Sequence, residues 1–564
     1  MEPREEFAAS VKHLTRRRFL GRAGAAGAAA AGAVIALRLD LLLDVQSAPL
    51  PSGLPAFPGA FGRIFPTLPP FAPASDAIKA ALVDIGKPSG LLDAKDDLSQ
   101  GPAALITDPA LSVNNPNNVT HTAGTTFMGQ FMDHDMTFDA TSPLGQPTDP
   151  TTARNARTAA FDLDSVYGLG PIGSPQLYDP KDPVKFRLGF GGLFEDLPRQ
   201  MDLDGTSNHT ALIGDPRNDE NIIISGLHAA FLQFHNRAVD HVRADGHDGH
   251  TRPAEVFLRA RLLTTWHYQW MIVHEFLPLF VGQNMVDDIL RNGPRFFKPK
   301  VGRAFIPVEF QTGTYRFGHS MVRPSYRANL NGDTGGPFFG FVFDPSQHPE
   351  DASQSPLADP NDLAGGARAP RRFIGWQTFF DFGDGEVKPN KVIDTTISTP
   401  LFTLPLLTIA SHTPPVALPQ RNLLRHLTWS LPSGQAIAKR MGVPALTADQ
   451  FTELAPYGLG FDTSTPLWYY MLREAGSTST TQPTLVPSPP PTPTTTGTGL
   501  RLGPVGGRIV GEVILELLRA DPTSYLAVDP RWRPSLPRRN RARDDFRMID
   551  FLTFAGVDPT SRGQ

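Results

Sequence analysis

The sequence predicts a mainly α-helical protein in which long irregular segments join the helices. Three observations support this fold class. Apolar residues recur three and four positions apart in several windows, as they do on one face of a helix. Strand-like alternation of apolar and polar residues is weak and short. The chain of 564 residues holds 56 prolines and 51 glycines, which favour loops between helical segments.

The expected helices begin near residue 120. The strongest candidate runs from Asn221 to Val242, where Ile223, Leu227, Phe231 and Phe234 fall on one face. Four further segments show helical patterns: Thr125 to Met136, Ala254 to Phe280, Asn422 to Met441 and Arg508 to Arg519.

The N-terminus carries the pattern of an export signal. The stretch TRRRFL, residues 15–20, places Arg16, Arg17 and Arg18 before Phe-Leu and precedes a small-residue apolar run from Ala23 to Leu37. Paired arginines in this setting indicate the twin-arginine route. A membrane helix is the alternative, but the run is short for a span. We therefore expect a signal region at 1–47, a candidate cleavage site before Ala48, and no stable membrane span after export.

Low-complexity segments suggest the remaining organisation. Residues 48–110 include a Pro-rich linker or N-terminal arm, and 111–557 form one catalytic domain. The stretch 476–499 (GSTSTTQPTLVPSPPPTPTTTGTG) is expected to be a mobile loop. Amphipathic patterns resume after it, which favours an insertion over a domain boundary. Residues 558–564 are a tail.

Composition excludes several classes of protein. The hydrophobic fraction of 40% and the charged fraction of 19% fit a globular protein with a sizeable core. The net charge of -4 gives no electrostatic footprint for nucleic acid. The count of 0 cysteines excludes thiol peroxidases, thiolate-ligated haem, CxxCH haem attachment and disulfides.

The first chemically dense stretch is GQFMDHD, residues 129–135. On a helix, Gln130 and His134 lie four residues apart and share a face. A histidine there can take a proton from a peroxide and return it to the leaving oxygen. Alone, the stretch fits a polar helix end or a simple metal site equally well.

Two more stretches supply a cation and a candidate axial ligand. In GDPRNDEN, Asn218 or Asp219 can cap the following helix, which leaves Arg217 at its mouth to stabilise developing negative charge. In YRFGH, the His319 imidazole can ligate haem iron, and Arg316 can pair with a haem propionate. Taken singly, these residues fit a surface arginine and a core histidine.

A fourth stretch, RNLLR, places Asn422 where a buried amide can accept the other ring proton of an axial histidine. The stretches follow one another along the chain as GQFxDHD, TxxxDxDSVYG, GDxRxxEN leading to LHxxFLxxHNR, YRFGH and RNLLR. Together and in this order they resemble the animal-type haem peroxidases, the superfamily of myeloperoxidase and peroxidasin, in a bacterial form. The resemblance covers residues 110 to 557 and implies one large helical haem-peroxidase domain with little β structure.

The resemblance implies a role for each motif residue. His134 is the distal acid–base, with Gln130 its partner and Arg217 the distal cation. His319 is the proximal iron ligand, Asn422 its hydrogen-bond partner and Arg316 a propionate contact. Asp133 and Glu220 match carboxylates that form ester links to haem b in some members. Asn221 replaces the methionine that follows this glutamate in myeloperoxidase, so no sulfonium link is expected.

The resemblance also implies a calcium ion beside the distal helix. Asp135 matches one ligand, and the others match Thr158, the Ala160 carbonyl, Asp162 and Asp164. Calcium prefers six to eight oxygen ligands of this mixed kind. Asp164 stands where a serine is frequent, and its extra charge is expected to tighten binding.

The function implied is reduction of hydrogen peroxide with oxidation of a small-molecule or halide donor. Fatty-acid dioxygenases of the same superfamily need a tyrosine three residues before the proximal histidine. That position is Arg316, and Tyr315 is expected to point elsewhere on the helix. The dioxygenase stays an alternative, as does a secreted haem-binding protein without turnover.

Overall fold

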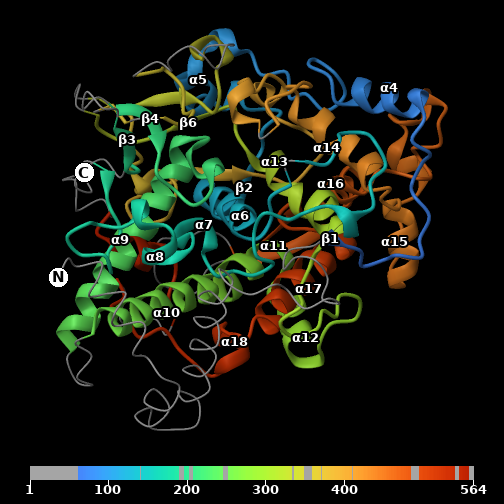
Figure 1. The fold of residues 1–564 in the computed structure, drawn as a ribbon. Coiled ribbons are helices and arrows are strands. Elements are labelled where there is room, and N and C mark those ends of the chain that lie inside the picture. Colours follow the sequence, from blue (N-terminus) through green and yellow to red (C-terminus); the bar gives the residue numbers. More distant parts are fainter. Residues whose placement is uncertain are drawn as a thin grey trace.

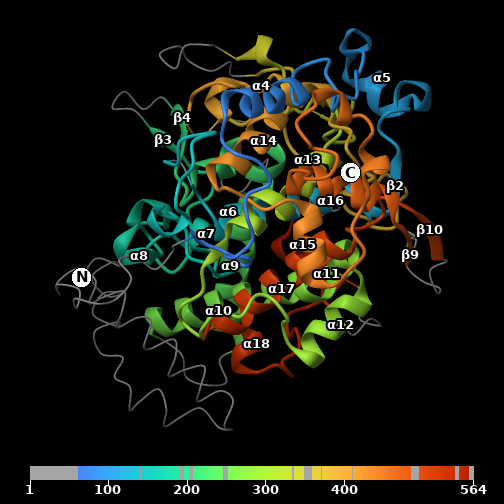
Figure 2. The ribbon, with the colours of Figure 1, turned by 90° about the vertical axis from the view of Figure 1, so that its right-hand side faces the viewer.

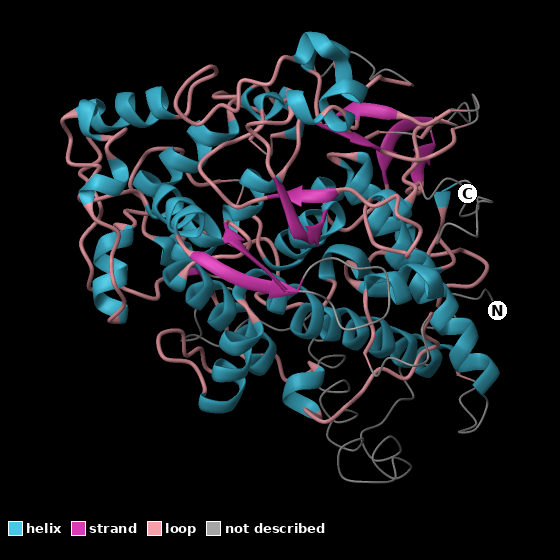
Figure 3. Cartoon of the chain, turned by 180° about the vertical axis from the view of Figure 1, so that it is seen from behind, coloured by secondary structure: helices cyan, strands magenta, loops and turns pink. Residues whose placement is uncertain are grey.

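The computed structural model describes residues 61–139, 141–189, 196–201, 207–245, 252–332, 336–348, 359–366, 368–369, 371–409, 411–483, 494–539 and 545–557. The expected signal region, its cleavage site, residues 48–60 of the arm and the 558–564 tail lie outside these ranges. Helices and loops dominate the fold, and the strands are short (Figure 3). The mainly α class is therefore confirmed.

The helices follow one another from α4 to α19 (Figure 1). Their bounds are α4 Asp76–Ile85, α5 Gly101–Thr107, α6 Ala123–Met136, α7 Asp164–Tyr167, α8 Gly170–Gly173, α9 Ile222–Asp245, α10 Pro253–Met271, α11 Leu277–Val281, α12 Gln283–Asn292, α13 Gly318–Met321, α14 Leu418–Thr428, α15 Gly434–Met441, α16 Leu467–Ser477, α17 Pro504–Ala520, α18 Tyr525–Val528 and α19 Met548–Ala555.

The strands form two-stranded pairs. One pair is parallel, β1 (Phe61–Gly62) with β5 (Ile306–Pro307). The others are antiparallel: β2 (Asn117–Thr122) with β8 (Pro389–Lys391), β3 (Arg199–Met201) with β4 (Ser207–Ala211), β6 (Ser325–Arg327) with β7 (Phe339–Phe341), and β9 (Ser479–Pro483) with β10 (Thr494–Thr498).

Three of the predicted helices occupy the expected places. Helix α6 begins two residues before the predicted Thr125, α9 matches its predicted span closely, and α17 extends the segment predicted from Arg508. The segment predicted from Ala254 to Phe280 continues from α10 through a π-helical turn, Ile272–Phe276, into α11.

Two predictions need correction. The helix expected from Asn422 to Met441 is split into α14 and α15, because Pro432 disfavours helical backbone at the residue before it. The segment 476–499, expected to be a loop, pairs at its ends as the β9–β10 hairpin, which lies at the edge of the molecule in Figure 2. Its threonines suit a pleated strand.

An aromatic cluster joins the central helices. Phe131 of α6 stacks on Phe231 of α9 with ring centroids 4.6 Å apart, and Tyr268 of α10 meets Phe231 edge-on at 5.4 Å. Each such pair contributes about 0.5–1.5 kcal/mol beyond burial alone. The cluster therefore fixes α6, which carries the GQFMDHD stretch, against α9 and α10.

The described part of the N-terminal arm packs into the same core. Phe61, Phe65 and Phe71 are buried. The backbone N–H groups of Ile64 and Phe65 donate to the Glu309 carboxylate at 3.1 and 3.0 Å. The arm is thus anchored to the segment that leads toward His319.

Among the described residues, no helix combines the length and apolar character that crossing a membrane requires.

Candidate functional site

One cavity of about 250 Å³ collects most of the predicted site residues. Its wall includes residues of α6, of the turn Pro216–Asp219 that precedes α9, and of the segment around α13. The predicted residues on this wall are Gln130, Asp133, His134, Arg217, Glu220, Arg316 and His319. Asn422 lies directly behind His319. Segments that are distant in sequence thus meet as the motifs predict.

His134 presents its Nε2 edge toward the cavity. It lies near the end of α6, and 4% of the residue is exposed. The Asn218 Oδ1 atom lies 2.9 Å from His134 Nδ1, and the Asn218 amide nitrogen lies 2.9 Å from Nδ1 of the buried His228. Because a carbonyl oxygen only accepts, His134 Nδ1 carries the ring proton and Nε2 keeps its lone pair. Burial lowers the pKa of His134 to about 3, so the ring is neutral.

Asn218 was missed as a site residue by sequence reasoning. It was expected, with Asp219, to cap the next helix. The cap is Asn221, whose Oδ1 accepts from the N–H groups of Ile223 and Ile224 at 3.1 and 2.9 Å. Asp219 instead pairs with Arg199. No sequence pattern distinguishes a capping asparagine from one that bridges two imidazoles.

Arg217 is held rigidly at the cavity wall. Its Nε and Nη2 atoms donate to the two oxygens of the fully buried Asp215 at 3.0 and 2.8 Å. Its Nη2 also donates to the His134 carbonyl at 3.2 Å, and its guanidinium lies 4.3 Å from the Phe138 ring centroid. This bidentate pairing fixes both the position and the charge of the cation.

Two carboxyls share the His134 side of the cavity. The Gln130 amide nitrogen donates to the Glu220 carboxylate, whose Oε1 lies 3.6 Å from His134 Nε2. Burial raises the pKa of Glu220 to about 8. Burial also raises the pKa of Asp133, while Arg217 and Arg316 oppose that shift. Both predicted ester-forming residues are therefore in the cavity.

His319 and Asn422 are in contact, but the sense of the contact differs from the prediction. The Asn422 amide nitrogen lies 2.8 Å from His319 Nδ1, while Arg316 Nη1 donates to Asn422 Oδ1 at 3.3 Å. The oxygen that was expected to accept the His319 ring proton is turned toward Arg316. A guanidinium has only donors, so it determines this orientation.

Tyr315 also departs from the prediction. It was expected to point elsewhere on a helix, but its side chain lines the cavity and its hydroxyl donates to the Gly129 carbonyl at 3.0 Å. The reason is local geometry. Tyr315 and His319 lie four residues apart, a spacing that keeps two side chains on one face, and the 3₁₀ turn Tyr315–Phe317 leads directly into α13, which carries His319.

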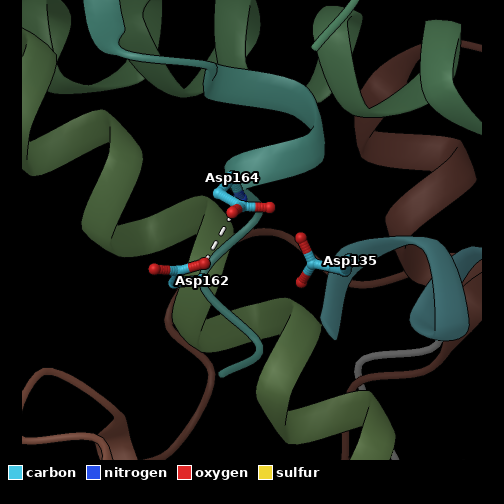
Figure 4. A group of neighbouring side chains, drawn as sticks. All are labelled: Asp135, Asp162 and Asp164. Atoms are coloured by element: carbon cyan, nitrogen blue, oxygen red, sulfur yellow. Dashed lines mark hydrogen bonds between the residues drawn. The ribbon is translucent and has the colours of Figure 1, made fainter. Parts of the chain in front are cut away.

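The predicted calcium ligands lie beside the distal helix. Carboxylate oxygens of Asp135, Asp162 and Asp164 are all within 4.8 Å of one another, and the three side chains point toward a common centre (Figure 4). Thr158 Oγ1 donates to Asp162 at 2.7 Å, and the Thr158 backbone N–H donates to Asp164 at 3.0 Å. Ala160 is a buried residue of the same loop.

The carboxylates of this cluster raise one another's pKa. Burial is the largest cause, and it raises the pKa of Asp164 to about 7 with Asp162 as the next cause. The pKa of Asp135 lies well above its usual value because of burial and the charges of Asp164 and Asp162. Buried like charges of this kind favour a bound cation.

Comparisons with known proteins agree with the motifs. The profile described as animal haem peroxidase matches residues 141–337. The human protein named probable oxidoreductase PXDNL is 28% identical over 236 residues, which are 38% of this chain and 16% of the human protein. Peroxidase mlt-7 of Caenorhabditis elegans is 29% identical over 213 residues, 34% of this chain and 27% of the nematode protein.

A solved structure shares the fold. Peroxidase A from Dictyostelium discoideum superposes with a TM-score of 0.53 at 15% sequence identity, covering 86% of this chain and 93% of that one. The chain therefore resembles animal haem peroxidases over residues 141–337 and shares the fold of the Dictyostelium protein.

Proposed function

We propose that the chain is a haem-dependent peroxidase that reduces hydrogen peroxide and oxidises a small-molecule or halide donor. The observation that carries the proposal is the composition of a single cavity. Gln130, His134 and Arg217 line it together with His319, and Asn422 lies behind His319. A neutral base, a fixed cation and an imidazole ligand are the groups that peroxide cleavage needs.

The cavity suits a haem b group. His319 offers an imidazole for the iron. Arg316 donates to two neutral oxygens, the Gln311 carbonyl and Asn422 Oδ1, and burial lowers its pKa to about 10. A propionate there would give this cation a carboxylate partner. Apolar walls for the porphyrin come from Phe276, Phe280, Val342, Leu401, Leu404 and Ile409.

Each protein group on the His134 side of the cavity has its own part in peroxide cleavage. Bound haem would supply the iron that binds peroxide and the redox capacity that accepts its oxidising equivalents. The Nε2 lone pair of His134 takes a proton from the peroxide and returns it to the outer oxygen as that oxygen leaves. Asn218 keeps the ring in the tautomer that this transfer requires. Arg217 stabilises the negative charge that develops on the leaving oxygen.

We further propose that calcium binds through Asp135, Thr158, the Ala160 carbonyl, Asp162 and Asp164. The convergence of three buried carboxylates supports this assignment. Since Asp135 directly follows His134, the ion would hold the C-terminal end of α6 in place. The ester links proposed for Asp133 and Glu220 are supported by their place in the cavity, and acid–acetone extraction of haem tests them.

The decisive experiment is an absorption spectrum of the haem-loaded protein before and after peroxide, followed by guaiacol and bromide oxidation. We expect His134→Ala to keep the haem spectrum and to lower the peroxide rate by about a hundredfold to ten-thousandfold. His121→Ala is the control, since His121 is also buried but does not line the cavity. Peroxide reduction by His134→Ala at the wild-type rate contradicts the assignment, and haem binding without turnover supports the non-catalytic alternative.

His319→Ala tests the other side of the haem. We expect it to lower haem occupancy or to alter the Soret band and the ferric spin state, because the iron loses its protein ligand. A normal spectrum in this variant excludes His319 as the axial ligand.

One observation favours a second candidate, a fatty-acid dioxygenase. Tyr315 lines the same cavity as His319, although it was expected to point elsewhere. A tyrosyl radical there would be placed to attack a bound lipid. Oxygen uptake with linoleate, lost in Tyr315→Phe, supports this function, and its absence in the wild type excludes it.

For localisation we propose export by the twin-arginine route from a bacterial cell. The support is the TRRRFL stretch and the apolar run after it, both outside the described residues. Because that route carries folded proteins, it suits a protein whose cofactor is inserted before export.

A further inference from the structure

Three of the 6 tryptophans of the chain meet at one place beside α10. Trp266 and Trp270 belong to α10, and Trp532 comes from the C-terminal part of the chain. The Trp532 ring centroid lies 5.4 Å from that of Trp266 and 6.0 Å from that of Trp270. Tyr525 of α18, which lies beside α10 in Figures 1 and 2, is 5.7 Å from Trp532 and 5.9 Å from Trp270. We call these four residues the tryptophan cluster.

The tryptophan cluster reaches the surface at Trp532. Trp266, Trp270 and Tyr525 are buried, with 7%, 3% and 1% of each residue exposed. Trp532 is half-buried. The exposed His274 stacks on Trp270 from outside, with ring centroids 3.7 Å apart. A molecule too large to enter the protein can therefore touch Trp532, but not the three rings behind it.

The inner end of the tryptophan cluster approaches the cavity through one helical segment. Trp270 and His274 lie four residues apart on the same face of α10 and the π-helical turn Ile272–Phe276 that continues it. Phe276 ends this turn, and its side chain lines the cavity. Trp270 and Phe276 are less than two helical turns apart, about 9 Å along the axis. A single element thus joins the tryptophan cluster to the wall of the proposed haem site.

Aromatic rings continue on the cavity side of this segment. The Phe276 ring centroid lies 4.5 Å from that of Phe280 and 6.5 Å from that of Tyr315, and all three side chains line the cavity. Electron transfer through protein slows steeply with distance, and oxidisable rings a few ångströms apart divide a long path into short steps. In a chain with 0 cysteines, tryptophan and tyrosine are the side chains that lose a single electron most readily. The tryptophan cluster therefore offers a path for electrons between the surface and the cavity.

The charges around the tryptophan cluster assign different parts to its rings. The Arg533 guanidinium lies 5.2 Å from the Trp270 ring centroid. A cation at that distance opposes positive charge on the ring that it faces, so an electron vacancy does not settle on Trp270. Trp532 borders water, which solvates a positive charge better than the protein interior does. Trp270 is thus suited to relay electrons, and Trp532 is suited to meet a donor.

We propose that Trp532 is a second oxidation site, at which phenols too large for the cavity give electrons to haem through Trp270 and the π-helical turn. This inference rests on the proposed peroxidase function, which supplies the oxidant. One electron passes from the Trp532 indole toward haem. A phenol at the surface restores the indole by giving one electron, and it releases its hydroxyl proton to water. Each hydrogen peroxide takes up two electrons and two protons to form two waters, so two phenols become phenoxyl radicals.

The test uses tyramine coupled to dextran, a phenol that cannot enter a cavity of about 250 Å³. Haem-loaded protein is mixed with peroxide and then with the polymer, while stopped-flow absorbance follows the change of the haem spectrum and its return to the resting form. In Trp532→Phe the first step should keep the wild-type rate, because the residues around His134 are untouched. The return with the polymer should slow about tenfold or more, because phenylalanine does not give up an electron readily.

Two further variants separate electron transfer from packing. Trp532→Tyr keeps an oxidisable ring at the surface, so its return rate with the polymer should be close to that of the wild type. Trp429→Phe is the matched control. Trp429 is fully buried, packs on Phe61 and does not line the cavity, so its replacement should leave both steps unchanged.

A chemical readout does not depend on turnover. When haem-loaded wild type receives peroxide without a donor, the electron vacancy stays on Trp532 and the ring reacts with water. Mass spectrometry of the peptides should then find added oxygen at Trp532. The buried Trp376 and Trp429 should stay unmodified, as should Trp532 in haem-free protein treated in the same way. This result is expected even where Trp532→Phe fails to fold.

Two results overturn the inference: a wild-type return rate of Trp532→Phe with the polymer, or no added oxygen at Trp532 in the haem-loaded wild type. A tryptophan cluster that only packs the C-terminal part of the chain against α10 gives both results. Failure of the proposed function looks different, since the haem spectrum of the wild type would then not respond to peroxide.

Discussion

Replacing Asn218 by alanine tests the distal side most directly. Asn218 bridges two buried imidazoles, with 2.9 Å contacts to His134 Nδ1 and His228 Nδ1. Each ring nitrogen left without a partner costs about 1–3 kcal/mol, so the free energy of unfolding should fall by roughly 2–6 kcal/mol. His134 would also lose the acceptor that keeps its proton on Nδ1, and the peroxide rate should fall by about a hundredfold or more.

Stopped-flow absorbance of the haem-loaded protein measures the peroxide rate, and urea unfolding measures stability. Asn218→Asp is the matched control, because its carboxylate still accepts from His134 Nδ1 and only His228 loses its donor. Its peroxide reactivity should stay close to wild type at neutral pH, and the added charge should raise the pKa of His134. An Asn218→Ala protein with a normal haem spectrum and a wild-type peroxide rate refutes the reasoning.

Three further outcomes are expected. Chelation of calcium at pH 7.5 should lower the melting temperature, because the Asp135, Asp162 and Asp164 carboxylates repel one another without an ion. The variant Asp164→Asn should show a smaller change on chelation. An unchanged melting temperature of the wild type after chelation contradicts the proposed calcium site. Burial raises the pKa of Glu474 to about 7, so the folded state binds more protons than the unfolded state between pH 4.5 and 7 and its stability falls as pH rises through that window. Between pH 4.5 and 7, the wild type should lose about 3 kcal/mol of unfolding free energy relative to Glu474→Gln. Urea unfolding at several pH values measures this, and an equal pH dependence of the two proteins excludes the effect of Glu474 on stability. Tyr315→Phe should cost about 1 kcal/mol, from the lost bond to Gly129, and should leave guaiacol oxidation intact; a large loss of peroxidase activity argues that the tyrosine takes part.

Periodicity predicted the long helices because their large apolar side chains recur every three or four residues. Helix α9, with Leu227, Phe231 and Phe234 buried along its length, is the clearest case. Helices α4, α5, α12 and α16 were not predicted. Several of these are short, and tertiary packing determines where short helices form. The β9–β10 pairing escaped prediction because the low complexity of this segment resembles that of a linker.

The roles assigned to the site residues stay predictions, and their geometry was predicted only in part. The motifs brought His134, Arg217 and His319 to one cavity, as expected. The orientation of the Asn422 amide depends on the Arg316 guanidinium, which residue spacing does not show. The four-residue spacing of Tyr315 and His319 did allow both to face one cavity, and that signal was not used.

The arm that Glu309 anchors has a consequence for the order of folding. Phe65 and the carboxylate that receives its N–H lie 244 residues apart, and the Phe71 N–H donates to the Leu431 carbonyl. Contacts this distant in sequence form slowly, because the entropy cost of closing the loop must be met before the contacts can stabilise the fold. During synthesis, the first part of the domain to emerge must therefore wait for more than half of the chain before it can close over the segment that bears His319. An N-terminal truncation past Phe65 should leave Glu309 buried without those donors, and refolding should then lose a late phase that the complete arm shows.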